Sequence, residues 1–333
     1  MRKITVVSLI AALLSLAGQK AWAQEIVVKL GTSAPRGSVW HNNLQDAAQK
    51  WKDISGGKVV LRIFPGGTMG DEGDMIKKMR VGTLQAAALS TVGLHDVVAE
   101  PQALDLPLLV DNDNERDYLL DKITPKLDAA VAQKGFIVLT WSDIGYTRFF
   151  STIERPSLDE MRKAKLFCWN GDPASKDAWV AGKFKPVLLS ATDMLPSLST
   201  GLIDTVLYPP VLVNALKLDD KVKFMLDLKY STLTGATVID KKTWDRIPAD
   251  IQPKLRQVFV ELGKKGTKDA RDQEAAALAA LAAKGVKKVA VQDKGAWAQA
   301  VQDVQNVVRG KVVPADIFDE VYRIVKDYRA GKR

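Results

Sequence analysis

The chain has 333 residues, with 48 lysines and arginines, 39 aspartates and glutamates, two histidines and one cysteine, and its formal net charge is +9. One cysteine excludes a disulfide within the chain, and so few histidines and cysteines argue against a metal or redox site, so no cofactor is expected. The basic residues are scattered among acids, so no nucleic-acid partner is expected either. The length suits two domains.

The first 23 residues have the three parts of a secretory signal peptide. Basic residues at 2–3 precede an apolar stretch over about 4–16, and Ala21-Trp22-Ala23 is a small-x-small cleavage sequence. We expect cleavage after Ala23 and a mature protein in the periplasm. The apolar stretch is too short for a transmembrane anchor, which needs about 20 apolar residues.

Strands and helices alternate through the first half of the mature chain. The expected strands are 25–31, 58–64 and 85–90, and the expected helices between them are about 38–55 and 71–81. Ser38 is a favourable cap for the first helix, and acids begin the second. This order of elements predicts a parallel sheet.

A second α/β unit begins near Gly135. Its expected elements are a strand at 136–141, a capping box at Ser157 and Glu160, a strand at 165–169, a helix from Pro173, strands at 184–189 and 202–208, and a helix from about 191. Two such units predict two lobes with a ligand crevice between them. Residues 248–284 then indicate one long helix across both lobes, or two helices separated at Gly263 and Gly266.

The stretch KLFCWNGDPAS, residues 165–175, places an aromatic and polar residues at the carboxyl end of a strand. Open α/β sheets bind ligands at such ends, so Trp169 and Asn170 are candidate ligand contacts. Asp172, directly before a proline, is expected to cap the next helix instead. Cys168 is expected to be buried and inert.

Two longer segments carry a family resemblance. They are VVLRIFPGGTMGDEGDMIKKMRVGTLQAA at 59–87 and MLPSLSTGLIDTVLYPP at 194–210. In this order and spacing the chain resembles the DctP-type substrate-binding proteins of TRAP transporters. The resemblance implies an α/β, two-lobed periplasmic-binding-protein fold of type II-like form that captures a small organic anion, expected to be a carboxylate. It also implies delivery to a membrane permease and no enzymatic activity.

The lobes are expected at 24–135 with about 230–265, and at 136–229 with about 266–333, after a signal peptide at 1–23. The long helix would be strained or straightened when the lobes close on the ligand. The expected partners are a small-molecule ligand and the TRAP permease subunits, and the protein itself is expected to be a monomer.

One residue departs from the family pattern. Typical members carry an arginine in the strand that begins the second half of the site, where it grips the ligand carboxylate bidentately. Alignment places Phe167 at that position. Arg148 and Arg36 are candidate replacements, and Trp169 with Asn170 is the preferred one, through stacking and amide hydrogen bonds.

Four further residues are candidate ligand contacts because each lies near the end of an expected strand or at the start of a helix: Trp40, Thr91, Trp141 and Tyr208. Tyr208 takes the place of an asparagine often found in the family. For Trp40 the alternative is packing in the first helical turn, and Trp141, at the end of a strand where the lobes cross, is expected to line the cleft. Asp204 is expected to anchor backbone at a strand start.

Two other classes of function remain open. A periplasmic hydrolase would need a catalytic motif, but no GxSxG, HExxH or P-loop sequence occurs. A receptor that presents its ligand-bound form to a membrane kinase would use the same two lobes, so the sequence does not separate sensing from transport.

Overall fold

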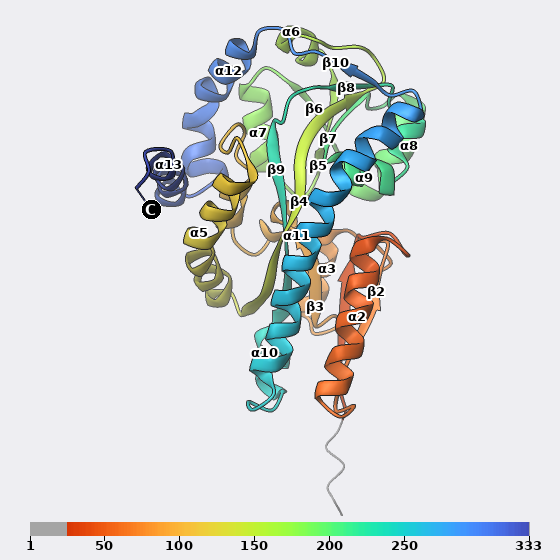
Figure 1. Cartoon of the computed structure of the whole chain (residues 1–333), viewed down its shortest axis with the longest axis vertical. Helices are drawn as coiled ribbons and strands as arrows, with labels where there is room; N and C mark the ends of the chain where they lie inside the picture. The colour runs from red at the N-terminus through yellow and green to blue at the C-terminus, as the bar shows by residue number, and fades with distance from the viewer. Residues whose placement is uncertain (1–24, 333) are drawn as a thin grey trace, which may run out of the picture.

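The computed structural model describes residues 25–332 (Figure 1). The strands are β1 (Ile26–Thr32), β2 (Val59–Phe64), β3 (Ala86–Ser90), β4 (Phe136–Ser151), β5 (Lys165–Trp169), β6 (Lys185–Leu189), β7 (Thr205–Tyr208), β8 (Phe224–Leu226), β9 (Ser231–Asp240) and β10 (Lys287–Val289). The longer helices are α2 (Val39–Ile54), α3 (Glu72–Arg80), α5 (Asp113–Gln133), α7 (Pro173–Ala181), α11 (Gln252–Ala283), α12 (Lys294–Val307) and α13 (Ala315–Arg329). Short helices are α4 (Thr91–Leu94), α6 (Leu158–Met161), α8 (Met194–Thr200), α9 (Pro210–Ala215) and α10 (Lys241–Arg246).

The strands form a mixed sheet in the order β2-β1-β3-β9-β4-β7-β5-β6, with β8 and β10 paired beside β4. In the first lobe, β1 pairs in parallel with β2 and β3, as the sequence predicts. In the second lobe, β5 pairs in parallel with β6 and β7. The fold is therefore a two-lobed α/β fold, in which each lobe has its own set of parallel strands.

Two antiparallel strands, β4 and β9, connect the lobes, and the sequence analysis did not predict their antiparallel pairing. The predicted strand at 136–141 is the first part of β4, which continues to Ser151 and pairs with β9 in one lobe and β7 in the other. The other is β9, which separates β3 from β4 and was missed. Antiparallel neighbours need no crossover helix, so the alternation of strands and helices gives no signal for them.

The long helix α11 is continuous, so the alternative of two separate helices is wrong. In Figure 1 it runs across the sheet from the lower lobe to the upper one. Gly263 does not break it but lets it approach β4, because a Cβ there would lie 2.0 Å from Thr140 Oγ1 and 2.5 Å from the Trp141 carbonyl oxygen. Within residues 25–332, no helix is long and apolar enough to cross a membrane.

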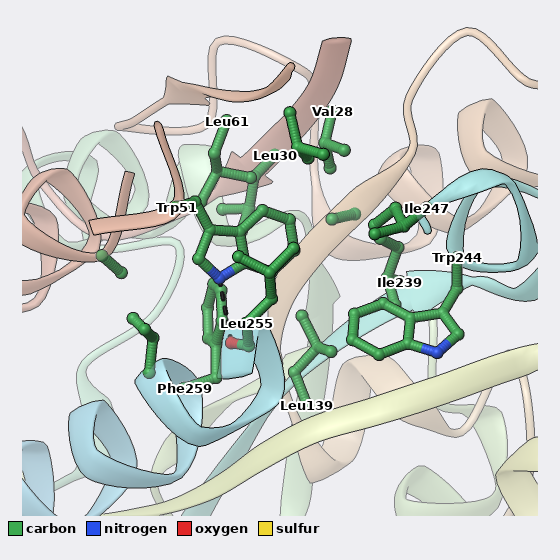
Figure 2. Packing of buried hydrophobic residues seen from close by; sticks show 14 of the residues in the cluster. Val28, Leu30, Trp51, Leu61, Leu139, Ile239, Trp244, Ile247, Leu255 and Phe259 are labelled. Carbon is green, nitrogen blue, oxygen red and sulfur yellow. Dashed lines mark hydrogen bonds between the residues drawn. The ribbon is translucent and has the colours of Figure 1, made fainter. Parts of the chain in front are cut away.

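The core of the first lobe is built around Trp51 of α2. Its indole Nε1 donates to the carbonyl oxygen of Leu255 at 3.0 Å, and its ring meets Phe259 edge-on (Figure 2). This cluster joins α2, β1, β2 and the first turns of α11. The expected caps are present: Ser38 accepts from the amide of His41, and Ser157 with Glu160 forms the capping box. The signal-peptide prediction concerns residues that lie outside those described.

Candidate functional site

The carboxyl ends of both sets of parallel strands meet between the lobes. In the first lobe, β2 ends at Phe64 and β3 at Ser90, and in the second, β5 ends at Trp169. Direct contacts join the two lobes here, the clearest being a 2.5 Å hydrogen bond from Trp169 Nε1 to Asp71 Oδ2 at the start of α3. This is the place at which open α/β sheets bind ligands.

Four neighbouring strands of the second lobe place one row of side chains at this edge. Trp169 is in register with Leu189 of β6, and Arg148 of β4 is in register with Tyr208 of β7. On the parallel strands β5 and β7, Leu166 pairs with Thr205. Trp169 and Tyr208 each lie three residues further along these strands, so they are level as well. Side chains that are level on adjacent strands share a face. Three of the predicted site residues, Trp169, Tyr208 and Arg148, therefore lie side by side.

Arg148 is the buried positive charge of this row. Its Nη2 forms an ion pair of 2.7 Å with Glu274 Oε1 of α11, and the arginine side chain is 6% exposed. Its Nε and Nη1 atoms are buried and make no hydrogen bond to the described residues. A buried guanidinium favours partners for all its N–H groups, because each unpaired donor costs free energy. The arrangement suits an additional anionic or carbonyl acceptor.

Phe167 and Tyr208 form the aromatic part of the same face. Their ring centroids lie 6.3 Å apart, and both pack against the apolar cluster below α8 and α9. Burial and the nearby carboxylates of Glu72 and Asp71 raise the pKa of Tyr208, so its hydroxyl stays protonated. That hydroxyl is free of hydrogen bonds to the described residues, and Tyr208 keeps some accessible surface. It is available as a donor or acceptor.

The indole of Trp169 lies between two glycines that belong to different lobes. A Cβ at Gly171 would come within 2.3 Å of the ring, and one at Gly73 within 3.6 Å. Asp71, which receives the indole N–H, also accepts from Ser190 Oγ at 2.9 Å and from the amide of Ala191 at 3.2 Å. Trp169 thus lies at the contact between the lobes, and its indole N–H is already engaged by Asp71.

Glu72 supplies a second carboxylate on the first-lobe side. Its Oε2 accepts from the amide of Ser90 at 3.0 Å and from Ser90 Oγ at 2.7 Å. Burial, with a smaller contribution from the charge of Asp71, raises the pKa of Glu72 to about 7, although Ser90 opposes that shift. The first-lobe side therefore offers oxygen acceptors, and the second-lobe side offers aromatic rings and an arginine.

Three other predicted site residues lie at exposed or partly exposed positions. Asn170 is exposed in the turn after β5, where its backbone N–H donates to the Leu189 carbonyl oxygen at 3.0 Å. Arg36 is exposed in the turn after β1, and Trp40 is partly buried in the first turn of α2. The side chains of Arg36 and Trp40 make no hydrogen bond or ion pair to the described residues.

Thr91 and Trp141 are engaged elsewhere. Thr91 is fully buried and its hydroxyl donates to Asp105, whose pKa is raised to about 6 because burial outweighs the effects of Arg116 and of nearby hydroxyls. Trp141 donates from Nε1 to Asp128 Oδ1 at 2.8 Å. It lines a groove of about 580 Å³ between α5, β4 and α11, and that groove includes none of the row formed by Trp169, Tyr208 and Arg148.

The structural roles expected for neighbouring residues are confirmed. Asp172 caps α7 by accepting from the amide of Ser175 at 3.0 Å. Asp204 accepts from the amide of Lys165 at 3.0 Å and pairs with Arg155. Cys168 is buried, and burial raises the pKa of its thiol to about 12.

The sequence interpretation did not include Asp71, Glu72, Ser190 and Glu274 among the site residues. Asp71 and Glu72 follow the end of β2, and Ser190 follows the end of β6, so the strand-end rule that singled out Trp169 would have found them too. Glu274 lies far from any strand end on the long helix, and its partner Arg148 is distant in sequence. No sequence signal marked it.

Curated relatives match over most of the chain. The family model "Bacterial extracellular solute-binding protein, family 7", DctP, matches residues 30–309. The C4-dicarboxylate-binding periplasmic protein DctP of Rhodobacter capsulatus is 21% identical and covers 88% of this chain and 89% of its own length. The sialic acid-binding periplasmic protein SiaP of Vibrio cholerae is also 21% identical, covering 85% of this chain and 88% of its own.

Solved structures agree with this fold. A TRAP periplasmic solute-binding protein of Ralstonia eutropha H16, with bound (S)-2-acetolactate, superposes with a TM-score of 0.84 at 20% identity, covering 91% of this chain and 99% of its own. The sugar acid-binding protein of Advenella mimigardefordensis, in complex with galactonate, gives a TM-score of 0.85 at 18% identity, with the same coverage. The chain thus belongs to the DctP family of bacterial extracellular solute-binding proteins, the periplasmic binding components of TRAP transporters, which bind solutes and are not enzymes.

Proposed function

We propose that this protein captures a small organic acid between its lobes and delivers it to the membrane permease of a TRAP transporter. The guanidinium of Arg148 binds the carboxylate of the ligand. Trp169 and Tyr208 form the wall beside it, and Glu72 is a polar contact from the first lobe. Phe167 is a packing partner of Tyr208 at the edge of the site.

The observation that carries this proposal is the state of Arg148. Its guanidinium is buried, paired at Nη2 with Glu274, and has two N–H groups without hydrogen-bond partners among the described residues. It lies level with Tyr208 and Trp169 at the carboxyl end of the second-lobe strands. A ligand carboxylate satisfies such N–H groups with charge-assisted hydrogen bonds, which lysine or an amide reproduces poorly.

The solutes named for similar proteins support an acid as the ligand class. They include a C4-dicarboxylate, sialic acid, (S)-2-acetolactate, D-glucuronate and galactonate. All are carboxylates, and most also carry hydroxyl or keto groups. Tyr208 and Glu72 are suited to hydrogen-bond such groups, so a hydroxy or keto acid fits this site better than an unsubstituted fatty acid.

In this proposal residues 1–23 direct export and are removed after Ala23. Residues 24–135 with about 230–265 form one moving lobe, and 136–229 with about 266–333 form the other. The strand β4 and the helix α11 connect them and flex when the lobes close. The ligand-bound form presents both lobes to the permease, and the protein acts as a monomer.

A thermal-shift screen tests the ligand class. Hydroxy, keto and dicarboxylic acids are compared one by one with their uncharged amides or alcohols, using the mature protein. A ligand present at about 100 times its Kd stabilises the folded state by about 2.7 kcal/mol, which is an easily measured shift. We expect at least one acid to raise the melting temperature while its amide does not.

Two results would contradict the proposal. The first is a panel in which uncharged analogues stabilise as well as the acids do. The second is turnover of a substrate by the purified protein. Small-angle scattering on the best acid adds a further check, because closure around a ligand requires the protein to become more compact.

A further inference from the structure

The described carboxylates at the strand ends outnumber the basic groups. Arg148 is the buried arginine of this edge, and Glu274 already pairs with it at 2.7 Å. On the first-lobe side, Asp71 and Glu72 begin α3, and both accept hydrogen bonds without an ion pair to any described residue. The site thus has three carboxylates for one guanidinium before a ligand acid binds.

Basic residues of the first-lobe side do not correct this imbalance. On α3, Lys78 and Arg80 donate to backbone carbonyl oxygens instead of the two acids. Arg36 is exposed, so solvent screens its charge. On the second-lobe side, the position at which a second arginine was expected is occupied by Phe167, which packs against Tyr208. Of the described side chains, Arg148 is therefore the buried cation available to a ligand carboxylate.

Tyr208 lies between Arg148 and the two acids of α3. It is in register with Arg148 on the adjacent strand. It is also close to the opposite lobe, because burial and then the charges of Glu72 and Asp71 raise the pKa of Tyr208. An acid whose carboxylate binds Arg148 and that extends along Tyr208 therefore has its far end beside Glu72.

The far end of such a ligand meets a group that only accepts hydrogen bonds. An ionised carboxylate has no donor, and Glu72 Oε2 already accepts from the amide and the hydroxyl of Ser90. A hydroxyl or an amide N–H of the ligand can donate to Glu72. A second ligand carboxylate has no proton to donate and places a like charge opposite Glu72, and such a juxtaposition costs enough free energy to reject a partner.

We propose that the site is specific for organic acids that carry one negative charge and a hydrogen-bond donor at the far end, and that Glu72 with Asp71 excludes dicarboxylates. This inference rests on the proposed function and narrows it, because it names which acids the site accepts. Glu72 determines this specificity, since it faces the far end of the ligand, and Asp71 adds to the same local negative charge.

Two pairs of probes differ only at the far end. Succinamate and succinate have the same length, and an amide in the first replaces a carboxylate in the second. Gluconate ends in a hydroxymethyl group where glucarate ends in a carboxylate. Calorimetric titration of each probe into the mature protein at pH 8, above the pKa of about 7 to which burial raises Glu72, measures the four dissociation constants.

Two variants remove one negative charge each. Glu72→Gln keeps the length of the side chain and an oxygen that can accept from Ser90. Asp71→Asn keeps a good cap for α3, because asparagine caps helices as well as aspartate does. Asp74→Asn is the matched control, because it removes an exposed charge from the same helix and lies outside the site. Circular dichroism verifies that each variant is folded.

We expect the unmodified protein and Asp74→Asn to bind succinamate and gluconate at least about ten-fold more tightly than succinate and glucarate. In Glu72→Gln this preference should fall by about ten-fold or more, as removal of a like charge from a partly buried site predicts. Asp71→Asn should lower it by less, because three donors of the second lobe already bind Asp71 Oδ2. A purely structural effect of either substitution would weaken both members of a pair alike and leave their ratio unchanged.

Two results would overturn the inference and leave the proposed function in place. One is a dicarboxylate that binds the unmodified protein as tightly as its singly charged partner, and the other is a preference that neither Glu72→Gln nor Asp71→Asn reduces. Binding of none of the four probes to any form of the protein would also overturn it. The proposed function is decided separately, by the thermal-shift screen over a wider set of acids, so the two fail in different experiments.

Discussion

The two lobes are joined in two regions of opposite character. Where α11 crosses β4, the contact is tight, because Gly263 leaves no room for a Cβ against Thr140 and the Trp141 carbonyl oxygen. Beside this crossing, Arg116 of α5 forms an ion pair of 2.5 Å with Asp143 of β4, and both side chains are at most 2% exposed. Arg116 also donates to the Leu233 carbonyl oxygen and to Thr234 Oγ1.

Across the strand ends, the contacts are fewer and less complete. Arg148 is about as buried as Arg116, yet its Nε and Nη1 atoms have neither a hydrogen bond nor an ion pair to the described residues. The one nitrogen of Arg116 without a hydrogen bond, Nη1, forms the ion pair with Asp143. Trp169 and Asp71 also keep accessible surface. The comparison separates two uses of a buried arginine. The first region is a permanent connection whose loss lowers stability, whereas the second is a separable contact whose loss changes binding.

The largest expected effect follows from removing Arg116. The substitution Arg116→Met should lower the free energy of unfolding by about 3–5 kcal/mol, because it leaves buried Asp143 with only Arg271 as its ionic partner. Urea denaturation measures this loss. The control Arg309→Ala breaks an exposed pair with Asp319 and should cost at most about 1 kcal/mol. Equal effects from the two substitutions would show that the Arg116 pair is not a permanent connection.

A smaller effect is expected from the glycines of α11. In Gly263→Ala the new methyl group meets Thr140 Oγ1 and the Trp141 carbonyl oxygen, so we expect a loss of about 3 kcal/mol. Gly266→Ala is the matched control: its methyl would lie 3.9 Å from Ser142 Oγ, and the better helix propensity of alanine should stabilise the protein by about 1 kcal/mol. If Gly263→Ala also stabilises the protein, α11 does not approach β4 as closely at Gly263 as described.

The smallest effect concerns Glu72 on the cleft side. Burial raises its pKa from 4.5 to about 7, so its contribution to stability is complete below about pH 4.5 and is lost as the pH rises through about 7. The full shift corresponds to about 3 kcal/mol, but Glu72 keeps some accessible surface, where solvent screening reduces the effect. The stability of the unmodified protein relative to Glu72→Gln should therefore fall by about 1–2 kcal/mol between pH 4.5 and pH 8. Urea denaturation at both pH values measures it.

Asp74→Asn serves as the control for that pH series. Asp74 lies on the same helix but is exposed, so Asp74→Asn measures what replacing a surface carboxylate by an amide changes in α3. A difference for Glu72→Gln that stays constant from pH 4.5 to pH 8 would mean that the Glu72 carboxylate is solvated like any surface acid.

Much of the fold follows from local sequence patterns. The strands β1, β2, β3 and β5 and the helices α2, α3 and α7 were predicted because each shows its own periodicity, cap or turn. The antiparallel pairing of β9 and the length of β4 were not predicted, because strand pairing depends on partners that are distant in sequence. Continuity of α11 through Gly263 likewise depends on packing against β4, which local propensity does not contain.

The candidate site was predictable to the extent that it lies at strand ends. Trp169 and Tyr208 lie there, and Arg148 is in register with Tyr208 on the adjacent strand. The partners of these residues were not predictable, because Asp71 and Glu274 are about 100 or more positions away in sequence. For the same reason Thr91, which directly follows the end of β3, proved to donate to a carboxylate distant from the strand ends of the second lobe, Asp105.

The role of Arg148 is tested most directly by calorimetric titration of the best organic acid, and of its uncharged amide, into the unmodified protein and into Arg148→Gln. Glu274→Gln is included as a control, because it removes the carboxylate that competes for Arg148 and should retain or strengthen acid binding. We predict that Arg148→Gln weakens binding of the acid by roughly 10- to 150-fold, as the loss of a charge-assisted pair implies, and changes amide binding by less than about three-fold. Equal losses for acid and amide, or unchanged affinity for the acid, would contradict the account.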